Sequence, residues 1–85
     1  MSRYNIIIAP RARKEIDSLE TAVKLRIGNA LILLAGDPFV GKSLKADLKG
    51  LYSYRVGDYR IIYSIVRRVL LIQVLKVMHL SLIHI

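Results

Sequence analysis

The chain has 85 residues, which suffice for one domain with a single small core and exclude a large two-lobed active-site cleft. It contains no cysteine, which excludes a disulfide framework and a thiolate metal site and fits a reducing cytoplasm. Lys and Arg total 14 against 6 Asp and Glu, and the resulting net charge of +8 favours nucleic acid or an acidic protein as partner.

The N-terminal part predicts a strand followed by a helical hairpin. Residues 4–9 are a β-rich run, and Pro10 ends it while supplying the fixed φ of a first helical turn. Helix one should bury Ala12, Ile16 and Leu19 and turn outwards Arg11, Arg13, Lys14, Glu15 and Asp17. Helix two should begin at about Thr21 and end near Gly36, because Asp37-Pro38 forbids continuation. Its inward stripe is Val23, Ile27, Ala30, Leu31 and Leu34.

Residues 37–50 mix Pro, Gly, Lys and Asp without a period and are predicted to be a connecting loop with at most one short turn of structure. Residues 36–43, at its start, satisfy the phosphate-binding P-loop pattern letter for letter. A P-loop needs a buried strand before it and a helix after it, whereas a helix is predicted before this one. We therefore reject nucleotide binding by this segment.

Residues 52–63 predict a β-hairpin with Gly57-Asp58 as its turn. The expected pairs are Val56 with Tyr59, Arg55 with Arg60, Tyr54 with Ile61 and Tyr52 with Tyr63. One face is then aromatic and aliphatic, and its four tyrosines should belong to the core rather than stack on bases. On the other face Arg55 lies opposite Arg60, which costs stability unless an anion lies between them. A phosphate partner is the functional interpretation, and two solvated arginines without a role are the alternative.

A run of basic residues leads into and beyond this hairpin. Cations placed along a loop and a concave strand face can contact consecutive phosphates without reading base sequence. The predicted phosphate-contacting residues besides Arg55 and Arg60 are Lys42, Lys45, Lys49, Arg67 and Arg68.

The C-terminal run predicts a last strand from Val69 to about Met78, after a turn at Arg67-Arg68. We reject a membrane span for residues 69–85, because the run is short and interrupted by Gln73, Lys76 and two histidines. The predicted fold is α+β with the order β-α-α-β-β-β: an N-terminal strand, a helical hairpin and an antiparallel three-stranded meander in one sheet. Residues 1–85 should form one domain.

Residues 48–63, which include Tyr54-Arg55-Val56-Gly57-Asp58-Tyr59-Arg60, closely resemble the central signature of the RelE/ParE toxin superfamily, especially its RelE branch. The resemblance spans roughly residues 3–79, including the Ala-Pro-Arg-Ala opening of helix one. It implies a RelE-like fold and a small basic cytoplasmic toxin that cuts messenger RNA in the ribosomal decoding site. It also implies an acidic antitoxin as partner, with no metal or other cofactor.

The implied reaction is attack of the RNA 2′-hydroxyl on the adjacent phosphate, giving a cyclic phosphate and a free 5′-hydroxyl. Arg55 and Arg60 match basic positions of the family, and Lys45 and Lys49 lie where it commonly places phosphate-contacting lysines. Fixed cations suit the charge that develops on the phosphorane. His79 matches the family's C-terminal histidine and is the candidate general base, although a lone histidine at a strand end is often structural.

Residues 80–85 depart from the family pattern. Leu80 stands where members usually have an arginine, and no tyrosine follows it. Cleavage should therefore be weakened or lost. This tail is β-prone, uncharged and free of proline, so it should extend the last strand or pair with a second copy in a homo-oligomer.

Three functions remain open at this point. The first is a RelE-type endoribonuclease, active or damaged. The second is a non-catalytic module, either a ParE-like inhibitor of DNA gyrase or a decoy that still binds antitoxin. The third is a simple RNA-binding domain.

Overall fold

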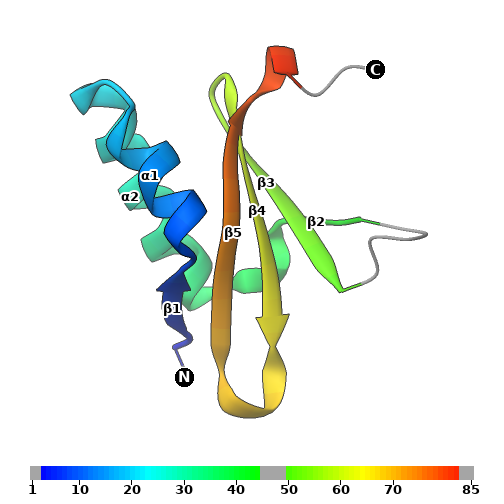
Figure 1. The fold of residues 1–85 in the computed structure, drawn as a ribbon. Helices are drawn as coiled ribbons and strands as arrows, with labels where there is room; N and C mark the ends of the chain where they lie inside the picture. Colours follow the sequence, from blue (N-terminus) through cyan, green and yellow to red (C-terminus); the bar gives the residue numbers. More distant parts are fainter. Residues whose placement is uncertain (1–2, 45–49, 83–85) are drawn as a thin grey trace.

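The computed structural model describes residues 3–44 and 50–82. The helices are α1 (Pro10–Asp17) and α2 (Thr21–Gly36), and the strands are β1 (Asn5–Ile8), β2 (Lys42–Ser43), β3 (Leu51–Val56), β4 (Tyr59–Val66) and β5 (Leu71–His79). The strands form one sheet in the order β1-β5-β4-β3-β2, in which β1 is parallel to β5 and the other neighbours are antiparallel (Figure 1). The α+β class and the predicted order of the main elements are confirmed.

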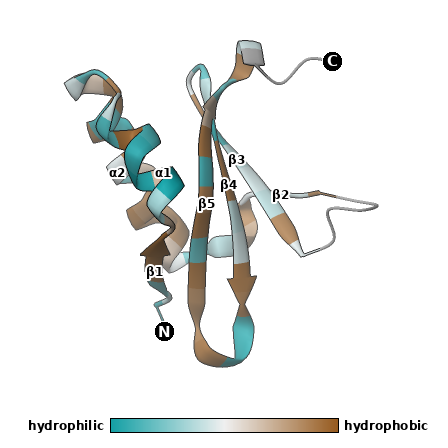
Figure 2. Cartoon of the chain, viewed as in Figure 1, coloured by the Kyte–Doolittle hydropathy of each residue, from teal (hydrophilic) through white to brown (hydrophobic). Residues whose placement is uncertain are grey.

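Both helices lie on one side of the sheet (Figure 1), and the core fills the space between them. The predicted inward stripe of α2 is confirmed, since Ile27, Ala30 and Leu34 are buried. The fully buried sheet residues Ile61, Tyr63, Ile72 and Val74 complete this core with Ala12 and Val77. Hydrophobic segments accordingly mark β1 and much of β5 in Figure 2.

The helix boundaries follow the sequence signals. Pro10 occupies the first turn of α1 behind an extended Ala9, where its missing N–H costs nothing. α2 ends at Gly36, and the Asp37 amide still donates to the Leu33 carbonyl before Pro38 stops the helix. The predicted ends at Thr21 and Gly36 are therefore confirmed.

The hairpin of β3 and β4 has the predicted register at all four pairs. Gly57 supplies the positive φ of 58° that its turn requires. The aromatic face packs against the helices as predicted, with Tyr63 buried and Tyr52, Tyr54 and Tyr59 half-buried at the edge of the core.

The second hairpin joins β4 to β5 through the 3₁₀ turn Arg67–Val69 and a left-handed Leu70. The predicted turn is confirmed. A register shift between Ile62 and Tyr63 places an extra residue, Leu75, on the β5 side, which is the pattern of a β-bulge. No sequence signal marks that bulge, so the pairing of β5 could not be derived in advance.

Two features differ from the sequence-based expectation. The segment predicted to be a loop contains the one short turn allowed for it, the 3₁₀ turn Pro38–Val40, but it also contains the strand β2, which pairs with β3 and makes the sheet five-stranded. Two residues are too few to show an alternating pattern. The tail does not extend the last strand over residues 80–82: β5 ends at His79, and Leu80–Leu82 form a 3₁₀ turn whose first amide donates to the Asp58 carbonyl. Residues 83–85 lie outside the described residues, so pairing with a second copy stays a prediction.

None of the helices in residues 3–44 and 50–82 is long and apolar enough to cross a membrane. The same residues contain no cluster of three or more His, Asp or Glu side chains that could hold a metal ion.

Candidate functional site

Arg55 and Arg60 lie directly opposite each other on the sheet face that points away from the helices. Successive side chains of a strand point to opposite faces of the sheet, and the neighbours Tyr54 and Ile61 point into the core. Arg55 is exposed and Arg60 is half-buried. The predicted pairing of the two guanidinium groups on one surface is therefore present.

These arginines share a cavity of about 290 Å³ with Lys42, Ser53 and Tyr54 and with residues 40–41. Lys42 reaches it because β2 pairs with β3 at Ser53. The described residues that line the cavity bring three cations and no carboxylate. Such a concentration of positive charge, the cationic cavity from here on, attracts an anion with several acceptor oxygens, such as a phosphate.

Two contacts characterise the guanidinium groups. The Nε of Arg55 donates to the Gly57 carbonyl at 2.9 Å, which fixes the side chain at the turn and leaves its terminal nitrogens available. The Nε of Arg60 is buried and has no hydrogen-bond partner in the described part of the chain. A buried donor without an acceptor costs about 1–3 kcal/mol. The same residue lines the cavity, where its positive charge attracts an anion.

A buried tyrosine fixes the segment that delivers Lys42. The Tyr63 hydroxyl donates to the Pro38 carbonyl at 2.7 Å. Burial raises the pKa of Tyr63 to about 12, so the hydroxyl stays protonated and can donate at neutral pH. A Cβ at Gly41 would collide with the same hydroxyl, so only glycine allows this close approach. Sequence reasoning placed Tyr63 in the core and missed its role in holding this loop.

The aromatic groups next to Tyr63 extend this support. Tyr52 stacks on Tyr63 with ring centroids 5.7 Å apart, and Phe39 meets Tyr52 edge-on at 6.0 Å. The guanidinium of Arg67 lies 5.6 Å from the centroid of the Phe39 ring. Arg67 is therefore held by a cation–π contact and is not part of the cationic cavity.

The remaining predicted RNA-contacting residues divide into two groups. Lys45 and Lys49 lie outside the described residues, so their place near the cavity stays a prediction. Arg67 and Arg68 are exposed in the turn after β4. The strand between Arg60 and Arg67 is about 23 Å long, at about 3.3 Å per residue. The structure does not bring these two arginines together with Arg55 and Arg60.

His79 lies on the opposite face of the sheet from the two arginines. It pairs with Tyr59, whose side chain packs against the core on the helix side of the sheet. The two rings meet edge-on with their centroids 5.1 Å apart. Its Nδ1 lies 2.7 Å from the Ser81 hydroxyl oxygen. The predicted catalytic set of Arg55, Arg60 and His79 thus does not converge on one point. Because the register of β5 was left open, the sequence could not reveal this separation.

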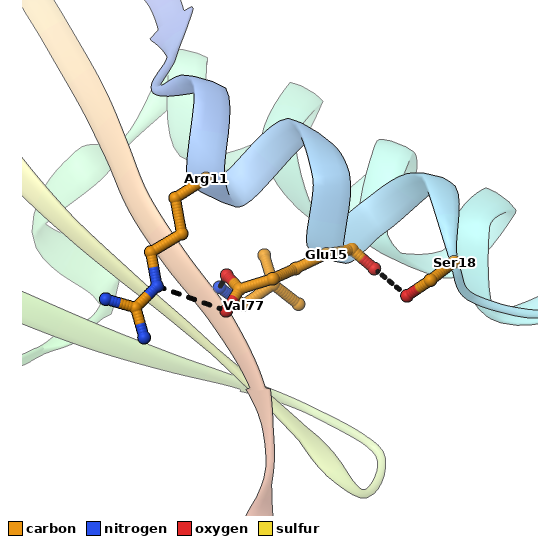
Figure 3. A network of polar contacts seen from close by, with 4 residues as sticks. All are labelled: Arg11, Glu15, Ser18 and Val77. Carbon is orange, nitrogen blue, oxygen red and sulfur yellow. Dashed lines mark hydrogen bonds and ion pairs between the residues drawn. The ribbon is translucent and has the colours of Figure 1, made fainter.

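His79 instead borders a second cavity, of about 450 Å³, between α1 and the free edge of β5. Glu15 was expected to face outwards, and the structure corrects this: one carboxylate oxygen accepts the Val77 amide at 2.8 Å (Figure 3). The reason is that β1 pairs with β5 only as far as Val74, so the amide beyond it needs another acceptor. Arg11 lies 3.6 Å from the other oxygen.

Comparison with known proteins places this geometry in a family. A family model described as the ParE toxin of type II toxin-antitoxin system, parDE, matches residues 6–81. A curated relative, the toxin RelE of Mycobacterium tuberculosis, is 33% identical over 64 residues, which cover 73% of this chain and 66% of the relative.

Solved structures agree with the fold described above. The RelBE2 toxin–antitoxin complex of Mycobacterium tuberculosis contains a chain that matches with a TM-score of 0.87 and 28% identity over 93% of both chains. The archaeal RelE–RelB complex of Pyrococcus horikoshii matches at 0.79 and 28% identity, over 93% of this chain and 97% of that one. The isolated RelE toxin of E. coli shares the fold at 0.77 and 20% identity, over 89% and 83% of the two chains. This chain therefore belongs to the RelE/ParE family of type II toxin–antitoxin toxins.

Proposed function

We propose that this toxin binds messenger RNA on the ribosome through the cationic cavity and is a ribosome-dependent endoribonuclease whose cleavage is weakened or lost. The convergence of Lys42, Arg55 and Arg60 on one cavity, whose described lining residues include no carboxylate, carries the proposal. The 33% sequence identity with a RelE toxin supports RNA as the anion that binds in this cavity. Cytoplasmic action follows from the proposed target.

The proposed reaction uses the RNA's own 2′-hydroxyl. That oxygen attacks the neighbouring phosphorus, the bond to the 5′-oxygen breaks, and a cyclic phosphate and a free 5′-hydroxyl result. Arg55 and Arg60 would hold the phosphate oxygens and stabilise the charge of the phosphorane, a contribution of about 3–4 kcal/mol for one well-placed donor. Because the hydrogen bond to the Gly57 carbonyl already fixes the Arg55 side chain, this side chain loses little conformational entropy when RNA binds.

Proton transfer should be the slow step of this reaction. A base must take the proton of the 2′-hydroxyl, and an acid must protonate the departing 5′-oxygen. Among the described residues that line the cationic cavity there is no carboxylate and no imidazole. His79 lies on the other face of the sheet, and Leu80 offers no charge. We therefore propose binding of the RNA backbone with slow cleavage.

Cleavage of messenger RNA on purified ribosomes tests this proposal. This toxin and the RelE toxin of Mycobacterium tuberculosis are added at equal concentration, and the cut products are mapped. We expect cleavage at least about tenfold slower for this chain, equivalent to about 1.4 kcal/mol of lost transition-state stabilisation. Cleavage as fast as the relative's, abolished by His79→Ala, would contradict the weakened activity and would assign His79 as the base.

A second candidate is supported by the family model that matches, which is that of a ParE toxin. In this proposal the chain is a non-catalytic module that inhibits DNA gyrase or sequesters antitoxin. Inhibition of DNA supercoiling by purified gyrase, together with unchanged messenger RNA on ribosomes, would favour it. The proposed antitoxin partner is common to both candidates, since relatives with 28% identity were solved as toxin–antitoxin complexes.

A further inference from the structure

Four neighbouring strands of the sheet carry one charged side chain each, and all four charges are positive. They belong to Lys42 in β2, Arg55 in β3, Arg60 in β4 and Lys76 in β5. No residue of the five strands is Asp or Glu. These strands are consecutive in the sheet, so the positive charges extend from its centre to the edge at β2.

The register of β5 places Lys76 on the same face as the two arginines. Residues that lie directly opposite each other in an antiparallel pair point to the same face of the sheet. Met78 is opposite Arg60, and Lys76 is opposite Ile62. Arg60 and Ile62 are two residues apart on β4, so both point away from the helices, and so do their partners. Sequence reasoning missed Lys76 because the register of β5 was left open.

The four side chains form a block in which cations and apolar groups alternate. We call Arg60, Ile62, Lys76 and Met78 the β4–β5 block. Its two cations lie on one diagonal and its two apolar side chains on the other, and diagonal neighbours are about 7–8 Å apart. All four residues are partly exposed. Neither α1 nor α2 covers them, because both helices lie on the other side of the sheet (Figure 1).

The ammonium group of Lys76 is available to a bound anion. Lys76 and Met78 also border the second cavity, which runs along the edge of β5 and contains Glu15. That carboxylate is engaged with Arg11 and with the Val77 amide. The Arg11–Glu15 contact is the only ion pair among the described residues, so Lys76 has no carboxylate partner there.

The block matches the parts of a nucleotide in a single strand. A phosphate is bound by a cation, and an unpaired base is bound by a surface on which its ring can lie. Arg60 already lines the cationic cavity, so a backbone that leaves the cavity towards β5 meets Lys76 next. Ile62 and Met78 then lie beside the nucleotide between the two phosphates. An acidic peptide would satisfy the cations but has no ring in its carboxylate side chains to cover the apolar pair.

We propose that the β4–β5 block is a nucleotide subsite next to the cationic cavity. Lys76 binds a second phosphate, and Ile62 and Met78 contact the base between the two phosphates. The inference rests on the proposed function, because it takes the bound anion to be single-stranded RNA. It adds that the base contributes to binding, whereas the cationic cavity alone would bind any chain of phosphates. The apolar contact reads no hydrogen-bonding pattern, so it is not base-specific.

The salt dependence of RNA binding tests the role of Lys76. Fluorescence anisotropy measures the affinity of the full chain for a short fluorescein-labelled single-stranded RNA. Lys76→Gln should reduce the slope of log K against log salt by about 0.7, the value for one phosphate contact of a single strand. Lys24→Gln is the matched control, because Lys24 is also half-buried but lies on α2, on the other side of the sheet. It should leave the slope unchanged.

An abasic ribose-phosphate chain of the same length tests the contact with the base. Met78→Ser should bind the RNA about fivefold more weakly, as expected for losing part of an apolar contact, and should bind the abasic chain as the wild type does. Met78→Leu keeps an apolar side chain and should restore the affinity for RNA. Circular dichroism checks that each variant is folded.

Failure of the subsite is distinguishable from failure of the proposed function. Equal slopes for Lys76→Gln and Lys24→Gln would overturn the second phosphate contact. Equal losses of RNA and abasic chain in Met78→Ser would overturn the base contact. In both cases weaker RNA binding by Arg55→Gln with Arg60→Gln would leave the cationic cavity intact. A wild type that binds neither chain at low salt would overturn the function and the subsite together. Displacement of RNA by polyglutamate at equal charge concentration would assign the face to an acidic protein.

Discussion

Replacing Tyr63 by phenylalanine removes one buried hydroxyl and tests how the loop that delivers Lys42 is held. The wild-type hydroxyl donates to the Pro38 carbonyl at 2.7 Å in a fully buried position. Losing that hydrogen bond and leaving the carbonyl without a partner should cost about 1–2 kcal/mol at neutral pH. In a domain of this size the melting temperature falls by about 4–8 °C per kcal/mol.

The alkaline pH dependence makes this prediction specific. Because burial raises the pKa of Tyr63 from 10.0 to about 12, the unfolded chain ionises first. The stabilising contribution of the neutral phenol is therefore complete below about pH 10 and is lost as the pH rises towards 12. At about pH 11 the wild type should have lost about 1.4 kcal/mol, and the variant has no such loss.

Urea unfolding of the wild type and Tyr63→Phe at about pH 7 and pH 11 measures both effects. The difference in unfolding free energy should be about 1–2 kcal/mol at pH 7 and should shrink towards zero at pH 11. Tyr52→Phe is the control, because Tyr52 belongs to the same aromatic stack and its hydroxyl makes no hydrogen bond within the described residues. A difference that is the same at both pH values would show that folding does not raise the pKa of the Tyr63 hydroxyl.

Two further predictions concern stability. Glu15→Ala should cost about 1–3 kcal/mol, since a β5 amide loses its acceptor. Arg11→Ala should stay within about 0.5 kcal/mol because the Arg11 side chain is largely exposed; equal effects in urea unfolding would contradict this. Gly28→Ala should raise the unfolding free energy by up to about 1 kcal/mol, since a Cβ there meets nothing within 4 Å. Gly41→Ala should lower it, because the new methyl group collides with a buried hydroxyl, and a stabilised Gly41→Ala would refute that contact.

The sequence was most informative where a local rule fixes geometry. A two-residue turn sets the register of a hairpin, so the opposition of Arg55 and Arg60 could be derived from Gly57-Asp58 alone. The stripe of α2 that faces the core was derived in the same way from its helical period.

The remaining features depend on contacts between distant segments. The bulge in β5 shifts the pairing by one residue and so determines on which face of the sheet His79 lies. No residue type in the sequence indicates this bulge. Glu15 turns inwards only because β1 is short enough to leave an amide of β5 uncovered. The hydroxyl of Tyr63 meets a carbonyl 25 residues earlier, a partner that no local pattern could identify.

We propose that the cationic cavity, rather than positive charge in general, binds the RNA backbone. The salt dependence of binding to a single-stranded RNA tests it in two variants with the same change in charge, Arg55→Gln with Arg60→Gln and Arg67→Gln with Arg68→Gln. Each lost phosphate contact should reduce the slope of log K against log salt by about 0.7. We predict a reduction of about 1.4 for the first pair and a much smaller one for the second. Equal reductions for the two pairs would show that net positive charge, and not the cationic cavity, determines RNA binding.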